Sequence, residues 1–85
     1  MFDTCKYIVF SRKDVGYPDF IIFSWLHKHC DMAQTMGLSQ SEILSAGFVK
    51  TCADKIVCFG KAQSLGVVSK EDEDSKLINR LMGNE

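Results

Sequence analysis

The sequence ILSAGFVKTCADKIVCFG, at residues 43–60, contains two apolar runs on either side of a short polar turn. The runs at 43–50 and 56–60 are rich in the β-branched and aromatic residues that favour strands. The turn at 52–55 is short, so we expect the two strands to form an antiparallel hairpin. Gly47, near the middle of the first run, predicts a β-bulge or the close approach of another backbone.

Two further strands are expected on the N-terminal side of this hairpin. Residues 7–10 read YIVF and are followed by the polar stretch SRKD, which is typical of a strand that ends in a loop. Pro18, which cannot lie inside a central ladder, precedes the sequence FIIF at residues 20–23. FIIF is apolar on both faces, so it suits a strand covered on both sides, or on one side with a partner on the other.

Two amphipathic helices complete the expected elements. The first lies between Ser24, its expected N-cap, and Gly37, its C-terminal stop. Its apolar side chains recur at helical spacing and are Leu26, Cys30, Met32, Ala33 and Met36. The second helix follows Ser69, which resembles the start of a capping box, and ends at Gly83. Its apolar stripe consists of Leu77, Ile78, Leu81 and Met82.

The expected order is therefore β-β-α-β-β-α, within a single α+β domain that spans residues 1–85. We expect a mostly antiparallel sheet of about four strands, with both helices packed on one face of it. The other face of the sheet would then be exposed, and it is the place where a partner would bind.

The composition is that of one small globular domain, with 46% hydrophobic residues and one proline among 85 residues. A domain of this size is marginally stable, which favours oligomerisation or a bound partner. Ten Lys or Arg residues against eleven Asp or Glu residues give a net charge of −1. Proteins that grip phosphates usually carry a basic excess, so nucleic-acid binding would here require a local basic patch.

The N-terminal sequence MFDTCKY lacks the basic start and long apolar core of a signal peptide. The longest apolar run, FIIF, is too short to cross a membrane. We therefore expect a cytoplasmic protein. In a reducing compartment the thiols of Cys5, Cys30, Cys52 and Cys58 should be free, and buried cysteine then packs as a small hydrophobe.

Few residue clusters point to chemistry. The candidate metal ligands are His27, Cys30, Cys52 and Cys58, but they lack the spacing Cys-x-x-Cys, so we expect no metal and no cofactor. The sequence GKAQSLG at residues 60–66 superficially resembles a phosphate loop, yet it lacks the Gly-Lys-Ser/Thr run at a helix start. No nucleophile stands beside a base and an orienting group, so we expect neither a catalytic residue nor an enzyme.

Charged and polar residues in loops, at strand ends and at a helix start are the candidate contacts for a partner. Lysines that flank aromatic strands can hold a single strand of nucleic acid while the rings stack on its bases, although most rings here are needed for the core. The acidic run at the start of the second helix suits the helix dipole, and it could also meet a basic protein surface. The candidates are Arg12, Lys13, Lys50, Lys55, Lys61, Gln63, Glu71, Asp72, Glu73 and Asp74.

The sequence SAGFV at residues 45–49 and the sequence CFGKAQSLG at residues 58–66 precede a short acidic C-terminal helix, and Met32-Ala33 and Gly37-Leu38 lie upstream. In this arrangement residues 20–82 resemble small proteins encoded in bacteriophage and prophage genomes, which have no assigned activity. The resemblance implies a phage accessory protein that acts in the bacterial cytoplasm. Such a protein would bind and block a host factor, for example a component of antiviral defence. The resemblance implies no catalytic residues.

Three functions follow from these observations, in order of preference. The first is a protein-interaction module, which could be a homodimer, whose sheet face or strand edge meets a protein partner. The second is a nucleic-acid-associated domain, which requires the basic candidates to converge on one face. The third is a small metal protein or enzyme that uses His27 and Cys30.

Overall fold

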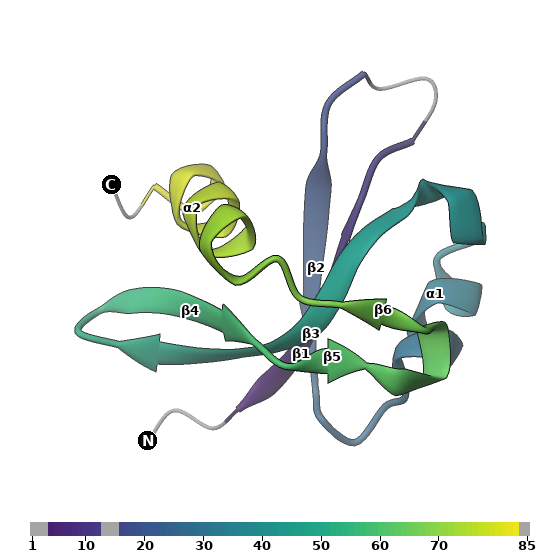
Figure 1. Ribbon diagram of the computed structural model, residues 1–85, viewed down its shortest axis with the longest axis horizontal. Helices are drawn as coiled ribbons and strands as arrows, with labels where there is room; N and C mark the ends of the chain where they lie inside the picture. The colour runs from purple at the N-terminus through teal and green to yellow at the C-terminus, as the bar shows by residue number, and fades with distance from the viewer. Residues whose placement is uncertain (1–3, 13–15, 84–85) are drawn as a thin grey trace.

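The secondary structure of the computed structural model, which describes residues 4–12 and 16–83, follows the expected order with four short additions (Figure 1). The added elements are two very short strands, β5 and β6, and two 3₁₀ helices of three residues each, η1 and η2. The α+β class is therefore confirmed. The elements are β1 (Cys5–Phe10), β2 (Asp19–Phe23), α1 (His29–Thr35), η1 (Gln40–Glu42), β3 (Ile43–Cys52), β4 (Lys55–Phe59), β5 (Lys61–Ala62), η2 (Gln63–Leu65), β6 (Val67–Val68) and α2 (Glu71–Leu81).

The main sheet has four strands in the order β2-β1-β3-β4, and every neighbouring pair is antiparallel. The expected β3–β4 hairpin is confirmed. Its two turn residues, Ala53 and Asp54, have φ angles of 51° and 66°, the left-handed conformation that a tight two-residue hairpin turn needs. Strands β5 and β6 form a separate two-stranded sheet that packs against β3.

Gly47 lies where another part of the chain passes close to β3. A Cβ atom at this position would stand 2.5 Å from the backbone oxygen of Phe59 and 3.1 Å from the Cβ of Ser69. No side chain fits at the first distance, so the close approach expected from the sequence is confirmed.

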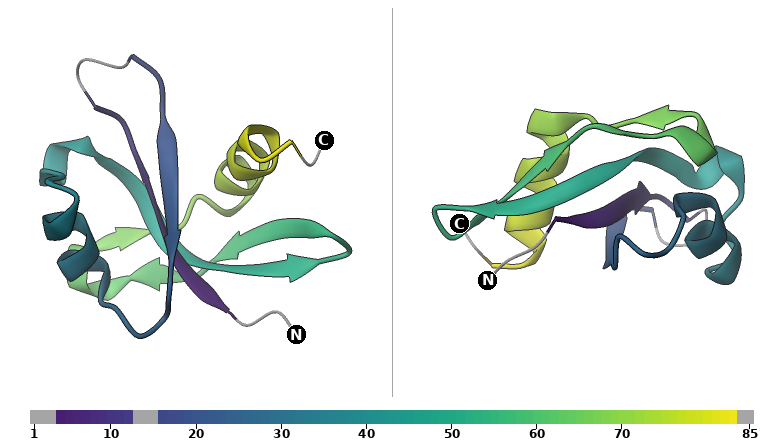
Figure 2. Two further views of the ribbon diagram at one scale, coloured as in Figure 1. Left: turned by 180° about the vertical axis from the view of Figure 1, so that it is seen from behind. Right: turned by 90° about the horizontal axis from the view of Figure 1, so that it is seen from below.

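The two helices cover opposite faces of the sheet, so the expectation that both pack on one face is wrong. Ile8 and Phe10 of β1 point to the face that α1 covers, which we call the α1 face. Tyr7 and Val9 point to the face that α2 covers, the α2 face. Because the central strand is buried on both sides, each side needs its own covering layer. Figures 1 and 2 accordingly show β1 and β2 between the two helices.

Helix α1 begins later than the sequence pattern predicted. Residues 24–28 form a turn instead, in which the Ser24 hydroxyl accepts a hydrogen bond from the Leu26 backbone N–H and the Ser24 carbonyl accepts one from His27. As a result Leu26, expected in the core, is 72% exposed, and its neighbour Trp25 is 59% exposed. The expected end of the helix is confirmed, since Gly37 follows α1 with a φ of +70°.

Helix α2 matches the expected element, but its contacts differ from the prediction. Its N-cap residue is Lys70 and no side chain caps it, because Ser69 hydrogen-bonds the Tyr7 hydroxyl instead. Within the apolar stripe Ile78 is fully buried, whereas Leu81 is 48% exposed. The helix therefore leaves the sheet in its last turn. No helix among residues 4–12 and 16–83 is long and apolar enough to span a membrane.

The outer edge of β4 is closed by side chains of α2. Asn79 accepts a hydrogen bond from the Ile56 N–H and donates one to the Ile56 carbonyl, both at 2.9 Å. The hydroxyl of Ser75 accepts one from the Cys58 N–H at 2.9 Å. These contacts satisfy backbone groups that an edge strand otherwise offers to another chain.

Candidate functional site

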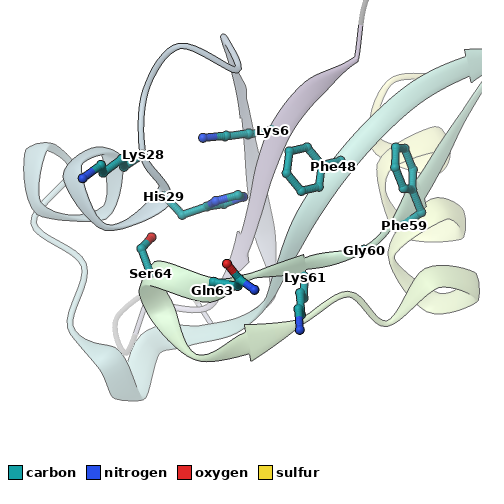
Figure 3. Close-up of a pocket in the computed structure, with 9 residues that line it drawn as sticks. All are labelled: Lys6, Lys28, His29, Phe48, Phe59, Gly60, Lys61, Gln63 and Ser64. Carbon is teal, nitrogen blue, oxygen red and sulfur yellow. The ribbon is translucent and has the colours of Figure 1, made fainter.

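A cavity of about 550 Å³ opens on the α1 face. It lies between the start of α1, the paired ends of β3 and β4, and the segment that turns into β5 and η2 (Figure 3). We call it the lysine pocket. Its lining consists of Lys6, Lys28, His29, Phe48, Phe59, Gly60, Lys61, Gln63 and Ser64.

Two phenylalanine rings form the apolar floor of the lysine pocket. Phe48 on β3 and Phe59 on β4 are register partners, so their side chains emerge side by side from the same face of the sheet. The two rings are stacked at 28° with their centroids 5.9 Å apart. Both side chains are only half-buried, so part of each ring faces the cavity. The exposed parts of the two rings form an aromatic surface that another planar ring can contact.

His29, the first residue of α1, closes the inner side of the pocket. The ring is buried and makes edge-on contacts with Phe23 and Phe48 at centroid distances of 5.5 and 5.7 Å. Its Nε2 lies 2.7 Å from the carbonyl oxygen of Gly47. A carbonyl only accepts, so Nε2 carries the hydrogen and donates it. Burial lowers the pKa of His29, with a further contribution from Lys6, and these effects outweigh the hydrogen bond to Gly47. The imidazole is therefore neutral at pH 7 and adds no charge to the pocket.

The positive charge of the pocket comes from lysines. Lys6 crosses its upper side and donates a hydrogen bond to the His27 carbonyl at 2.7 Å. The side chains of Lys28 and Lys61 start at the rim and point outward from the cavity in Figure 3. Both residues are exposed, and neither ammonium group makes a hydrogen bond or ion pair within residues 4–12 and 16–83. Just outside the lining, the Nζ of Lys50 lies 5.3 Å from the centroid of the Phe59 ring. No acidic residue is part of the described lining.

The segment GKAQS at residues 60–64 builds the remaining wall. Gly60 has a φ of +81°, a conformation that turns the chain from β4 into β5 while Phe48 packs against it. The hydroxyl of Ser64 accepts a hydrogen bond from the Cys30 backbone N–H at 3.1 Å, which joins this wall to α1. The stretch that resembled a phosphate loop in the sequence thus lines a lysine-rich cavity, without a Walker arrangement.

The structure separates the basic candidates from one another. Lys61 and Gln63 line the pocket and Lys50 lies at its rim, whereas Lys55 is exposed in the first position of β4. Arg12 is far from this group: its guanidinium donates to the Met36 carbonyl at 2.9 Å and covers the Phe10 ring. Lys13 lies outside the described residues.

Two lysines of the pocket were not among the sequence candidates. Lys6 belongs to β1, and Lys28 belongs to the loop before α1, where it lies between the candidate metal ligands His27 and Cys30. Lys6 has a signal of its own, because it interrupts the inward side of an otherwise apolar strand. A charged residue on an inward face is a reason to look for a ligand.

The acidic candidates lie at the start of α2, the helix that covers the other face. Glu71, Asp72 and Glu73 are exposed in its first turn. Asp74 is only 3% exposed, so it is not available to a partner. Its carboxylate accepts hydrogen bonds from the Tyr7 hydroxyl, from the Ser45 hydroxyl at 2.8 Å and from the Lys70 N–H at 3.0 Å.

Asp74 and its partners form a structural network. They join β1, β3, the loop before α2 and α2 itself, and burial raises the pKa of Tyr7 so that its hydroxyl stays protonated and donates. Every buried side-chain polar atom in the described part of the chain has a hydrogen-bond partner. A buried polar group that is fully satisfied stabilises the fold and offers nothing to a ligand.

The candidate metal ligands are not assembled. Among residues 4–12 and 16–83, no three His, Cys, Asp or Glu side chains lie close enough to share a metal ion. His27 and Cys52 are exposed, Cys30 is half-buried, and Cys58 is fully buried in the core. Cys30, Cys52 and Cys58 form no disulfide, and burial raises the pKa of the Cys58 thiol to about 11.

The lysine pocket therefore combines an aromatic floor, formed by Phe48 and Phe59, with exposed lysines at its rim. The floor can stack with a planar ring, and ammonium groups can hold phosphate oxygens. No protein-family model matches the chain, and no curated protein or solved structure shows significant similarity to it.

Proposed function

We propose that this protein is a binding module for nucleotides, either free or within a nucleic acid, and that the lysine pocket is the binding site. The observation that carries the proposal is the stacked pair of Phe48 and Phe59, bordered by Lys28 and Lys61, whose charges have no described protein partner. A nucleotide combines the two features that this site complements, a planar base and a negatively charged phosphate.

The size of the cavity supports this proposal. A volume of about 550 Å³ lies within the range of cavities that hold small organic ligands. Such sites are mostly apolar with a few polar groups that orient the ligand. Here the apolar part is the phenylalanine floor, and the polar groups are the lysines, Gln63 and Ser64.

The distribution of charge also supports it. Although the net charge is −1, acidic and basic groups are separated in the fold. The acidic run at Glu71–Asp74 lies on α2, on the other side of the sheet from the lysines of the pocket. The local balance at the pocket is positive. A negative ligand is therefore attracted to this face although the whole chain is nearly neutral.

The proposal is tested by titrating the ¹⁵N-labelled protein with UMP and AMP and following backbone amide shifts. We expect shifts that saturate and that cluster at the pocket, including the amides of Phe48 and Lys61. The variant Lys61→Glu should weaken binding, since it reverses one charge at the rim. The matched variant Lys76→Glu changes an exposed lysine on α2 and should bind like the wild type. Shifts that do not saturate, or equal weakening by both variants, would refute the proposal.

A protein partner is a second candidate function, and the edge strand β2 favours it. Strand β2 pairs with β1 along one edge, and its Phe20 N–H donates a hydrogen bond to the Asp19 carboxylate. The half-buried Ile21 and Ile22 lie in this strand, which leads into the exposed Trp25 and Leu26. An open apolar edge can add a strand from another chain.

The molar mass in solution, measured by light scattering, tests whether that strand comes from a second copy. A dimer that Ile22→Lys converts to a monomer would support pairing through β2, and a monomer at all concentrations would exclude a second copy. The phage origin and the binding of a host defence factor stay predictions of the sequence resemblance.

A further inference from the structure

We infer that the ligand of the lysine pocket is a single strand of nucleic acid rather than a free nucleotide. This inference rests on the proposed function and concerns the same site. The observation behind it is the placement of the cations, which lie on both sides of the phenylalanine floor.

On one side of the floor stands Lys28, at the residue before α1. Figure 3 shows Lys28 and Phe59 at opposite sides of the pocket, with Lys61 below the space between His29 and Phe59. Lys50 lies beyond the floor, because its Nζ covers the Phe59 ring at 5.3 Å. A line of positive charge therefore runs from α1, past Lys61, to the β3–β4 hairpin.

This arrangement matches the repeating chemistry of a strand. In a polynucleotide each base has a phosphate on both its 5′ and its 3′ side, whereas a free nucleotide carries all its phosphate on one side. A base stacked on Phe48 and Phe59 would place one phosphate near Lys28 or Lys61 and the other near Lys50. A free nucleotide leaves the lysines on one side without a partner.

The floor also favours an unpaired strand. In a duplex the faces of the bases are covered by their neighbours, so a protein ring reaches them only where the strand is single. A ring that stacks on a base contacts its face and makes no hydrogen bond to its edge. The contact should therefore form with any nucleotide sequence. RNA and DNA share both features that the pocket complements, the base face and the phosphate.

The test compares ligands of increasing length on the wild-type protein by isothermal titration calorimetry. The probes are UMP and dTMP, oligouridylate and oligothymidylate of about four and about eight nucleotides, and a DNA duplex of about eight base pairs. We expect the oligonucleotides to bind at least about tenfold more tightly than the mononucleotides, because stacking and phosphate contacts add. The duplex should bind more weakly than either strand.

Salt provides a second measure of the same contacts. For single strands log K falls with log salt by about 0.7 for each phosphate neutralised, so one phosphate near Lys28 or Lys61 and a second near Lys50 predict a slope of about −1.4. The variant Lys50→Ala should make the slope shallower by about 0.7 and weaken oligonucleotide binding several-fold. It should weaken mononucleotide binding by a smaller factor than oligonucleotide binding, because a mononucleotide has fewer phosphates to lose. The control Lys76→Ala, on the other side of the sheet, should change neither.

The outcomes separate this inference from the proposed function. Equal affinity for mononucleotides and oligonucleotides, with no effect of Lys50→Ala on either, would overturn the inference and leave the nucleotide site intact. Binding of neither would overturn both. Equal binding of single-stranded and duplex DNA would show that the contact is with phosphates alone, and it would overturn the role of the phenylalanine floor. Tighter binding of the oligonucleotides than of the mononucleotides, in either the uridine or the thymidine series, would support the inference and identify the preferred polymer.

Discussion

The two faces of the central sheet both contain polar side chains, but they use them differently. On the α2 face the polar groups of Tyr7, Ser45 and Asp74 are buried and bond to one another. On the α1 face Lys28 and Lys61 surround a cavity and have no described protein partner. A buried polar group must be satisfied within the protein, so the polar side chains of the α2 face stabilise the fold. The ammonium groups of Lys28 and Lys61 on the α1 face have no such partner, and they remain accessible to a ligand.

The comparison explains how so small a domain can keep an open pocket. The α2 face holds Tyr7, Val49, Cys58 and Ile78 with at most a trace of exposure, together with the Asp74 network. It can therefore supply stability that the α1 face lacks around its cavity. Substitutions of polar residues on the α2 face should therefore lower the stability of the fold. Substitutions of the lysines on the α1 face should lower ligand binding and leave the stability unchanged.

The largest effect on stability is expected from Asp74→Ala. The variant leaves the buried hydroxyl of Ser45 and the Lys70 N–H without their acceptor, and it removes one bond of Tyr7. We expect a loss in the free energy of unfolding on the order of 3 kcal/mol, and a Tm about 10–20 °C lower, measured by circular dichroism. The control Asp72→Ala alters an exposed carboxylate in the same helix turn and should change the Tm little. Equal Tm values for the two variants would contradict the structural role of Asp74.

A smaller, pH-dependent effect is expected from His29, which joins the pocket to the core. Its pKa in the folded state is lower than the ordinary value of 6.5, chiefly because the ring is buried. The unfolded chain therefore takes up the proton more readily, and the stability is complete above pH 6.5 and decreases as the pH falls below it. Thermal unfolding measured from about pH 8 to about pH 5.5 should show a falling Tm.

The variant His29→Gln isolates this contribution, since an amide can still donate to the Gly47 carbonyl but does not titrate. Its Tm should depend less on pH over this interval than the Tm of the wild type. His27→Gln, at an exposed position, serves as the matched control and should keep the wild-type pH dependence. If His29→Gln retains the full pH dependence, another group is responsible for it.

The smallest effect on stability is expected from the rim of the pocket. The side chains of Lys28 and Lys61 are exposed, and their ammonium groups make no described bond to the protein, so Lys28→Ala and Lys61→Ala should change the free energy of unfolding by less than about 0.5 kcal/mol. The double variant removes two like charges from one site and should be as stable as the wild type. Chemical denaturation provides the measurement. A loss of more than about 1 kcal/mol would show that these lysines stabilise the fold. It would contradict the proposed difference, in which polar side chains stabilise the fold on the α2 face and not at the rim of the pocket.

Several features were predictable because they are encoded within a few consecutive residues. The β3–β4 hairpin follows from two apolar runs and a short turn, and the end of α1 follows from Gly37. The close approach at Gly47 was predictable as well, because a glycine inside a strand often marks a place where another backbone comes near. The start of α1 was mispredicted, because the Ser24 hydroxyl and carbonyl stabilise a turn as readily as a helix N-terminus.

The candidate site was only partly predictable. The sequence pointed to Lys50, Lys61 and Gln63, and the structure places these three at the pocket. It also pointed to Arg12 and Asp74, which contact the protein itself instead. Lys6 and Lys28 were not singled out from the sequence, because a single lysine in a strand or loop resembles any other solvated lysine.

The sequence alone therefore determined the kinds of elements and their order, since hydrophobic period, turn residues and helix stops act between near neighbours. Tertiary structure alone decided which face each helix covers and which side chains surround the cavity. The lysine pocket gathers residues from β1, the loop before α1, α1, β3, β4, β5 and η2. These meet through the pairing of β1, β3 and β4 and through the packing of α1 and of the β5–η2 segment against those strands. A contact between distant segments depends on the register of the paired strands and on the burial of both faces of β1. Neither can be predicted from a short stretch of the sequence.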